Sequence, residues 1–300
     1  MILIGTGNMA KEYARVFHHL GLPFVTIGNT DLGSLTFSKW LREHSIFAEV
    51  IPGGVTGKIL KGQEVVVAVP IPLLYETTKN LILKGARKIL VEKPGVLYSI
   101  QARALVHLSD SYKADIYVGY NRRFYKSVQE ARDIIRRDGV EKLHFSFGED
   151  IEWLKGSSHH VKSVKDRWII ANASHCIDTA LFLLDAPVQG MFVETVNPFR
   201  GSGFAGNTQF TYRTDWTKDR RWKIEFVTKR KETYCLGPFE KLVRKENGNS
   251  STVLAYDTDE LKPGVQGMVS SFLGDQKDLL TIKQQQDRLL LYMKMGGLAE

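Results

Sequence analysis

A short run of residues near the start of the chain has the spacing of a phosphate-binding loop. The residues that match the pattern G-x-G-x-x-G/A are Gly5, Thr6, Gly7, Asn8, Met9 and Ala10. In this pattern Gly5 permits a tight turn, Gly7 lets the backbone approach a pyrophosphate, and Ala10 allows a helix to pack closely on a strand. A helix that begins near Met9 adds free N–H groups and a favourable dipole for the anion. The loop therefore predicts a dinucleotide site, and the alternative is a purely structural turn.

The end of the next apolar run bears on which dinucleotide would bind. An NAD site usually carries an acid there for the ribose hydroxyls, but Gly28 and Asn29 occupy these positions and Asp31 lies further along the loop. The side chains that could instead surround a 2′-phosphate are those of Asn29, Thr30, Ser34 and Lys39. We expect NAD or NADP as the cofactor, with a slight preference for NADP.

Further motifs follow in a fixed order over about the first 185 residues. They are Val69-Pro70, Glu92-Lys93-Pro94, Gly119-Tyr120-Asn121-Arg122-Arg123-Phe124, and His175 with Asp178. Together with the glycine loop, their order and spacing resemble the Gfo/Idh/MocA family, the glucose-fructose oxidoreductase and inositol dehydrogenase group. The resemblance implies a Rossmann domain, a second domain that binds substrate, a nicotinamide cofactor and a sugar-like substrate.

The resemblance also implies a role for Lys93, because the matching lysine of the family hydrogen-bonds the reacting hydroxyl or carbonyl group and takes part in proton transfer. Ligands of open α/β sheets lie outside the carboxyl ends of the strands, which is where Pro70, Lys93 and Asn121 fall. Pro70 and Glu92 are expected to contribute to the cofactor site. The alternative is a surface lysine at the end of a strand. A cis peptide bond before Pro94 would fix the turn.

His175 is the second candidate for catalysis, as a substrate contact or acid/base group. It lies three residues before Asp178, so both project from one side of the first turn of a helix expected near residues 174–184. We expect Lys93 and His175 to face one another across a pocket between the domains. The residues expected to bind the substrate are Asn121, Arg123, Asn172 and Asp178. A buried histidine with a structural role, and an aspartate placed by the helix dipole, are the alternatives.

Two positions depart from the pattern of the family. Many of its dehydrogenases carry an aspartate four residues before the histidine, which completes a Lys-Asp-His relay, whereas this chain has Ala171 there. A histidine that is frequent four residues after Pro70 is Leu74 in this chain. Without the relay acid, Lys93 would have to manage the proton alone, and simple secondary-alcohol oxidation of the inositol dehydrogenase type is in doubt.

The elements that must position these residues alternate between strands and helices up to residue 119. Continuous apolar runs bounded by turn residues predict buried strands at residues 2–4, 24–27, 65–69, 88–92 and 115–119. Helical spacing lies between them, for example at Met9, Tyr13 and Phe17. This alternation predicts a doubly wound parallel sheet of the Rossmann type over residues 1–119.

From residue 120 to 300 the pattern changes to longer strands of alternating polarity. They are expected near residues 143–148, 191–196, 208–213 and 222–228, with helices near 124–137, 174–184 and 278–295. We therefore predict a second, α+β domain with an antiparallel or mixed sheet, which binds the substrate and carries the contacts between subunits. A homodimer or homotetramer is expected from the resemblance.

Composition and charge exclude several classes of function. The 300 residues are 43% hydrophobic and 25% charged, as in an ordinary globular protein, and suggest two domains. The formal net charge is +8, but the basic residues are scattered and accompany no known nucleic-acid-binding motif. We expect no nucleic-acid or membrane partner, no bound metal and a cytoplasmic location. Cys176 and Cys235 lack the spacing of a metal site or disulfide framework, so both are expected to be reduced.

These observations leave three hypotheses for the function. The first is hydride transfer between NAD(P) and a carbon of a sugar, a sugar acid or a nucleotide-linked sugar. The second is redox-assisted glycoside cleavage, in which NAD is reduced and reoxidised within one turnover. The third is a non-catalytic sugar or dinucleotide sensor, which the missing relay acid would fit. Lys93 and His175 argue against the third, because a pure sensor needs neither proton-transfer group.

Overall fold

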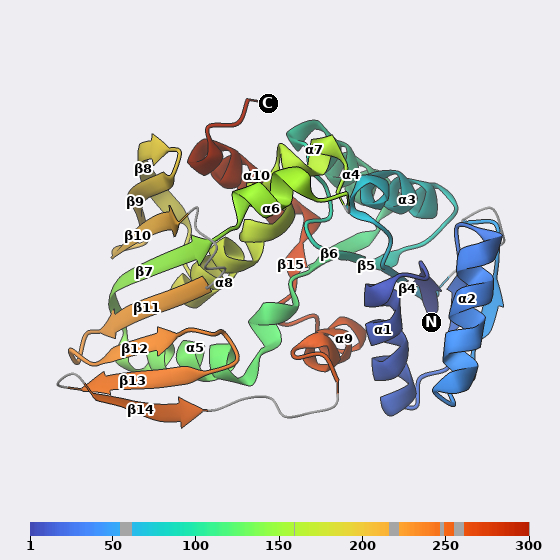
Figure 1. Cartoon of the computed structure of the whole chain (residues 1–300), viewed down its shortest axis with the longest axis horizontal. Coiled ribbons are helices and arrows are strands. Elements are labelled where there is room, and N and C mark those ends of the chain that lie inside the picture. The colour runs from blue at the N-terminus through green and yellow to red at the C-terminus, as the bar shows by residue number, and fades with distance from the viewer. Residues whose placement is uncertain (55–61, 159, 216–221, 247–248, 255–260, 300) are drawn as a thin grey trace. The chain divides into compact units, whose positions relative to one another are not determined.

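The computed structural model describes residues 1–54, 62–158, 160–215, 222–246, 249–254 and 261–299. This described part of the chain divides into two compact units, whose helices and strands are drawn in Figure 1. Apart from these gaps, the first unit contains residues 1–120 and 261–289, and the second contains residues 121–254 and 290–299. Each unit has a β-sheet of its own.

The first unit contains a sheet in which, among the described residues, seven strands follow the order β15-β6-β5-β4-β1-β2-β3. Their bounds are β1 (Ile2–Ile4), β2 (Val25–Ile27), β3 (Glu49–Ile51), β4 (Glu64–Val67), β5 (Lys88–Glu92), β6 (Asp115–Gly119) and β15 (Leu280–Thr281). Strands β1 to β6 are parallel to their neighbours, and β15 is antiparallel to β6. This arrangement confirms the doubly wound parallel sheet that the apolar runs predict.

Helices between these strands bury one apolar stripe each. Their bounds are α1 (Asn8–His19), α2 (Asp31–Glu43), α3 (Ile71–Leu83) and α4 (Ser99–Tyr112). The buried side chains of α1 include Tyr13, Val16 and Phe17, which recur at the spacing of one helix face. The central strands β1, β4 and β5 are almost wholly buried, as expected for a parallel sheet that is covered on both faces.

The chain returns to the first unit near its C-terminus. Helix α9 (Val265–Leu273) packs against α1, and β15 pairs with β6 so that Leu280 lies opposite Val118. Helix α10 (Ile282–Gly296) follows directly. The expected second domain ran without interruption from residue 120 to 300. The observed division differs because Val265, Met268, Val269, Phe272 and Leu280 bury their apolar side chains in the first unit.

The second unit contains a mixed sheet of eight described strands in the order β14-β13-β12-β11-β7-β10-β9-β8. Their bounds are β7 (Val140–Gly148), β8 (Val188–Val196), β9 (Phe199–Ala205), β10 (Thr208–Asp215), β11 (Trp222–Thr228), β12 (Thr233–Leu236), β13 (Leu242–Glu246) and β14 (Asn249–Leu254). Strands β7 and β10 are parallel and the other neighbouring pairs are antiparallel. The mixed sheet expected from alternating polarity is confirmed, with four strands (β9, β12, β13 and β14) beyond those the pattern predicted.

One long helix and several short helices precede the helix that carries His175. Their bounds are η1 (Asn121–Phe124), α5 (Lys126–Asp138), α6 (Ile151–Gly156), α7 (Lys162–Lys165) and the π-helical turn η2 (Ile169–Ala173), which leads into α8 (Ser174–Leu184). Every residue of α8 is buried, and α8 packs on β7 and β11. No helix among the described residues is long and apolar enough to cross a membrane.

Candidate functional site

The first unit gathers the expected cofactor residues at one edge of its sheet. Because β1, β2, β4 and β5 run parallel, the residues that follow them lie at the same edge. These residues are the loop from Gly5 to Met9, Asn29 with Thr30, Pro70, and Glu92 with Lys93. Pro70 is exposed and forms the N-cap of α3.

Gly5 is a glycine for a structural reason. Its φ is +119°, and a Cβ built there would lie 2.3 Å from the carbonyl oxygen of Ala68. The backbone N–H of Gly5 donates to the carbonyl of Ile27, with an N–O distance of 2.9 Å. The tight passage of the loop between β2 and the end of β4 therefore requires glycine at this position.

At Gly7, by contrast, the described part of the fold does not require a glycine. Its φ is −83°, which any residue can adopt, and apart from its chain neighbours no described residue has an atom within 4 Å of a Cβ built there. It forms the N-cap of α1 without a side-chain hydrogen bond, and the first turn of α1 carries no acid. The open space thus lies where N–H groups and a positive helix end are exposed, which fits a pyrophosphate.

The end of β2 offers polar groups for a ribose but no obvious cation for a 2′-phosphate. A Cβ on Gly33 would lie 2.9 Å from the hydroxyls of both Thr6 and Thr30, so these two side chains converge at the start of α2. Asn29 is exposed beside them, while the Thr30 hydroxyl accepts the N–H of Gly33 at 3.1 Å. This cap leaves Thr30 able to donate one hydrogen bond.

Two other side chains considered for the 2′-phosphate point elsewhere. The hydroxyl of Ser34 is turned back to the carbonyl of Thr30 at 2.8 Å. Lys39 lies eight residues beyond the start of α2, about 12 Å along the helix axis, and pairs with Glu43 at 3.8 Å. The part of the NADP preference that rested on Ser34 and Lys39 is therefore not supported by their geometry.

Glu92 is a buried carboxylate at the end of β5. Oε1 of Glu92 accepts a hydrogen bond of 2.7 Å from the hydroxyl of Tyr13 on α1. Burial raises the pKa of the Glu92 carboxyl, while the Tyr13 hydrogen bond and the charges of Lys93 and Lys262 act in the opposite direction. The Tyr13 hydrogen bond ties the motif around Lys93 to the helix that begins at the glycine loop.

Lys93 is half-buried and precedes a turn that a distant side chain holds in place. The Lys93–Pro94 peptide bond is cis, as the motif predicted. The carbonyl of Pro94 accepts a hydrogen bond of 2.8 Å from Nε2 of Gln285, which is wholly buried on α10. The same Nε2 donates to the hydroxyl of Tyr120 at 3.2 Å.

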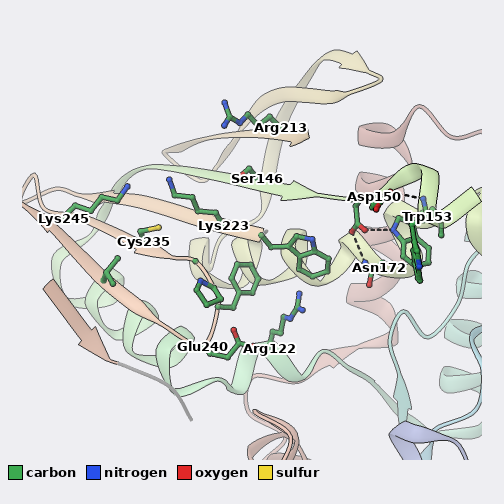
Figure 2. A pocket seen from close by; sticks show the side chains of 18 residues that line it. Arg122, Ser146, Asp150, Trp153, Asn172, Arg213, Lys223, Cys235, Glu240 and Lys245 are labelled. Atoms are coloured by element: carbon green, nitrogen blue, oxygen red, sulfur yellow. Dashed lines mark hydrogen bonds between the residues drawn. The ribbon is translucent and has the colours of Figure 1, made fainter. Parts of the chain in front are cut away.

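The second unit contains a pocket with a volume of about 1120 Å³, shown in Figure 2. Its lining combines aromatic rings with charged and amide side chains. The aromatic residues are Trp153, Trp168, Trp222 and Phe239, and the polar residues include Arg122, Glu149, Asn172, Arg213, Lys223 and Lys245. Asn172 is the expected substrate residue that lines it, and Arg122 belongs to the same motif as the expected Asn121 and Arg123.

Asn172 belongs to a hydrogen-bonded cluster around a carboxylate. Nδ2 of Asn172 and Nε1 of Trp168 donate to the two oxygens of Glu149, each at 2.9 Å. Glu149 is only 6% exposed and follows β7, so it joins the end of the sheet to the π-helical turn before His175. Ala171 in this turn is buried. Sequence reasoning did not identify Glu149, because the residues that join it lie 19 and 23 positions away.

Arg122, rather than Arg123, lines the pocket. The guanidinium of Arg122 stacks on Trp222, 4.1 Å from the ring centroid, and its Nη1 is buried with no hydrogen-bond partner among the described residues. Arg123 instead forms a bidentate ion pair with Asp178, with N–O distances of 2.7 and 2.6 Å. Both side chains of this pair are buried, at 6% and 1% exposure. This buried pairing holds both side chains toward each other, so the structure gives Arg123 and Asp178 a structural role beside the substrate contacts expected of them.

The remaining two expected residues lie close to this lining. Asn121 is buried and hydrogen-bonds the hydroxyl of Tyr125. His175 is 9% exposed, and its ring centroid lies 6.4 Å from that of Trp222. His175 is therefore next to a ring that lines the pocket, but it is not itself among the lining residues.

Both cysteines are unlinked and buried. Burial raises the pKa of the thiols of Cys176 and Cys235, so both are protonated at neutral pH. This agrees with the reduced state expected from the sequence. No group of three or more metal-ligating side chains is assembled within the described ranges.

Comparison with known proteins gives matches to structure alone. No family model and no curated protein sequence matches the chain. A dehydrogenase from Chromobacterium violaceum matches with a TM-score of 0.80 and 13% identity, over 99% of this chain and 94% of that one. UDP-N-acetylglucosamine 3-dehydrogenase from Acidithiobacillus ferrooxidans matches with a TM-score of 0.69 and 12% identity, over 99% and 96%.

A third match is biliverdin reductase from Synechocystis, whose structure contains biliverdin and NADP+. Its TM-score is 0.70 at 15% identity, over 99% of this chain and 98% of that one. The chain thus has the fold of these dehydrogenases and of this reductase, a fold that the motifs implied. At such identities the likeness establishes the fold, and function must be argued from the site.

Proposed function

We propose that this chain is an NAD(P)-dependent oxidoreductase that transfers hydride to or from a sugar-like substrate, namely a sugar, a sugar acid or a nucleotide-linked sugar. The observation that carries the proposal is the open space at Gly7, at the uncapped start of α1. The fold shared with dehydrogenases supports it, and one of these acts on a nucleotide-linked sugar according to its name.

The residues of the first unit fit a nicotinamide dinucleotide. We propose that the N–H groups of Asn8 and Met9 bind the pyrophosphate, since they lie at the start of α1, and that Thr6 and Asn29 bind the adenosine ribose. The bound cofactor would supply the hydride chemistry. The protein would orient it and control one proton.

We assign that proton to Nζ of Lys93. Lys93 follows β5 at the ligand edge of the sheet, which is the edge that carries the expected cofactor residues. The turn after Lys93 is fixed by the hydrogen bond from Gln285 to the carbonyl of Pro94. A lysine in such a position can donate a hydrogen bond to the reacting oxygen and exchange a proton with it. We propose His175 as the second acid/base group, held in place by the buried helix α8.

The pocket of the second unit is the proposed binding site for the substrate. Trp222 and Phe239 offer aromatic faces, and Glu149 with Asn172 offers fixed polar groups, as in pockets that bind small ligands. Nη1 of Arg122 is a buried donor without a partner in the described part of the chain. Since buried donors are nearly always satisfied, we propose that an oxygen atom of the substrate accepts this hydrogen bond.

One observation favours an alternative function. Ala171 is buried and stands where the resemblance expects the relay aspartate, which fits a sensor that binds the same ligands without turnover. Redox-assisted glycoside cleavage is the other alternative, and it would show no net consumption of free cofactor.

The test is a thermal-shift screen with NAD+, NADP+, sugars, sugar acids and nucleotide-linked sugars, because ligands that bind the native state raise the melting temperature. Substrates found in this way are then assayed for net NAD(P)H formation or consumption. Ligand binding without turnover would support the sensor, and failure to bind any dinucleotide would overturn the proposal.

Calorimetry measures which cofactor binds more tightly. We expect NADP+ to bind at least as tightly as NAD+, and a tenfold preference for NAD+, about 1.4 kcal/mol, would contradict this.

A further inference from the structure

A lysine from the C-terminal part of the chain lies beside the glycine loop. Nζ of Lys262 is 3.0 Å from Sδ of Met9, which is in the first turn of α1. Lys262 stands just before α9, and its carbonyl accepts the N–H of Val265 at 3.2 Å. Because α9 packs against α1, this turn keeps the lysine next to the loop although 253 residues separate it from Met9.

Among the described residues, the hydrogen bond of the Lys262 ammonium group goes to the thioether of Met9. A thioether is a weak, uncharged acceptor, so Met9 does not neutralise the ammonium. The side chain belongs to an exposed residue. Its charge also reaches Glu92, where it opposes the rise in pKa that burial causes. The charge therefore acts along the ligand edge of the sheet, from the glycine loop to the end of β5.

The glycine loop itself lacks a cation. The positions from Gly5 to Ala10 contain no lysine or arginine. The next residue, Lys11, lies over the ring of Trp40 at 5.5 Å from its centroid and so faces α2. Backbone N–H groups and the helix dipole contribute about half an elementary charge at the start of α1, whereas a pyrophosphate bridge carries two negative charges.

We propose that Lys262 binds the pyrophosphate of the dinucleotide, together with the N–H groups at the start of α1. This inference rests on the proposed function and adds a cofactor contact that is distant in the sequence from the glycine loop. The residues that return to the first unit thus have a binding role as well as a structural one.

The test compares Lys262→Met with Lys262→Arg, which keeps the charge, and with Lys283→Met, which removes an exposed lysine elsewhere in the returning segment. The probes are NAD+, NADP+ and ADP-ribose, which keeps the pyrophosphate but lacks nicotinamide. Calorimetry should show about tenfold weaker binding of all three by Lys262→Met, as expected for loss of one charge-assisted hydrogen bond. The two other variants should bind like the unaltered protein, and the salt dependence of binding should decrease only in Lys262→Met.

The outcomes separate the inference from the proposed function. If the unaltered protein binds these probes and Lys262→Met binds ADP-ribose equally well, the inference is wrong and the proposed function stands. If Lys262→Met weakens NAD+ but not ADP-ribose, Lys262 contacts the nicotinamide half and the inference is again wrong. If the unaltered protein binds none of the probes, both are wrong. Melting temperatures establish that each variant is folded.

Discussion

The hydroxyl of Tyr13 on α1 donates a hydrogen bond of 2.7 Å to Oε1 of Glu92 at the end of β5, and both side chains are buried. This bond joins two segments of the proposed cofactor site that are 79 residues apart. A buried carboxylate with a raised pKa makes folding depend on pH, so the pair can be tested without a substrate.

We expect Glu92→Gln to remove a pH dependence of stability. The pKa of Glu92 is raised above its ordinary value of 4.5 in the folded protein. The folded state therefore favours the protonated carboxyl, and the unaltered protein should lose stability relative to Glu92→Gln as the pH rises above 4.5. Urea unfolding between pH 4 and pH 7.5 measures this difference. Parallel stability profiles for the two proteins would contradict it.

Tyr13→Phe should destabilise the protein by about 1–3 kcal/mol at neutral pH, because a buried acceptor loses its donor. Loss of this donor also raises the pKa of Glu92 further, since the Tyr13 hydrogen bond lowers it. The decline in stability with increasing pH should therefore extend to higher pH in Tyr13→Phe. The double variant Tyr13→Phe with Glu92→Gln should not show this decline, and its presence there would assign it to another group.

The two glycines of the loop should respond differently to the same change. Gly7→Val should keep the fold, because its Cβ enters space free of described atoms, and should weaken dinucleotide binding by at least about tenfold through steric occlusion. Gly5→Val should lower the melting temperature strongly, because of its positive φ and the nearby carbonyl of Ala68. Calorimetry and thermal unfolding measure the two effects. A folded Gly7→Val variant with unchanged cofactor affinity would rule out the loop as the pyrophosphate site.

Lys93→Ala should reduce the rate of hydride transfer by about 100-fold to 10,000-fold, the usual contribution of a general acid or base. With alanine at position 171, no relay carboxylate at that position can take over the proton. His175→Ala should reduce the rate to a smaller extent, and both variants should bind the cofactor almost normally. Turnover with the substrate found by screening, beside cofactor titration, measures both. A fully active Lys93→Ala enzyme would exclude the proposed mechanism.

Neighbouring arginines provide a matched comparison in the second unit. Arg122→Met should weaken ligands of the pocket by about tenfold or more, since one charge-assisted hydrogen bond is lost, and should cost about 1 kcal/mol of stability from lost stacking on Trp222. Arg123→Met should cost about 3–5 kcal/mol, because it leaves Asp178 buried and unpaired.

The double variant Arg123→Met with Asp178→Leu serves as the control for this comparison, because it removes both charges of the buried pair. It should recover part of the stability lost in Arg123→Met. Urea unfolding and ligand titration are the measurements. Equal effects of the two arginine substitutions on binding and stability would refute the assignment of ligand binding to Arg122 and of a structural role to Arg123.

The sequence by itself determined the features that depend on neighbours along the chain. Strand and helix periodicity and the glycine loop predicted the parallel sheet, because these signals arise from local backbone geometry. The expected role of Glu92-Lys93-Pro94 came from the family resemblance. Helix α8 was predicted over residues 174–184, and the structure places it there. Strands β3 and β15 gave no such signal, since β3 (Glu49–Ile51) is partly exposed and begins with a glutamate, and β15 has only two residues.

Tertiary structure alone decided which side chains meet. Arg122 and Arg123 are adjacent and chemically alike, yet one lines the pocket and the other is committed to Asp178, 55 residues away. Lys262 reaches Met9 only because α9 packs on α1, and Glu149 meets Asn172 only because the end of β7 lies beside the π-helical turn. The physical reason is that side-chain partners are selected by the packing of whole elements, and residues distant along the chain approach each other only after the sheets have formed.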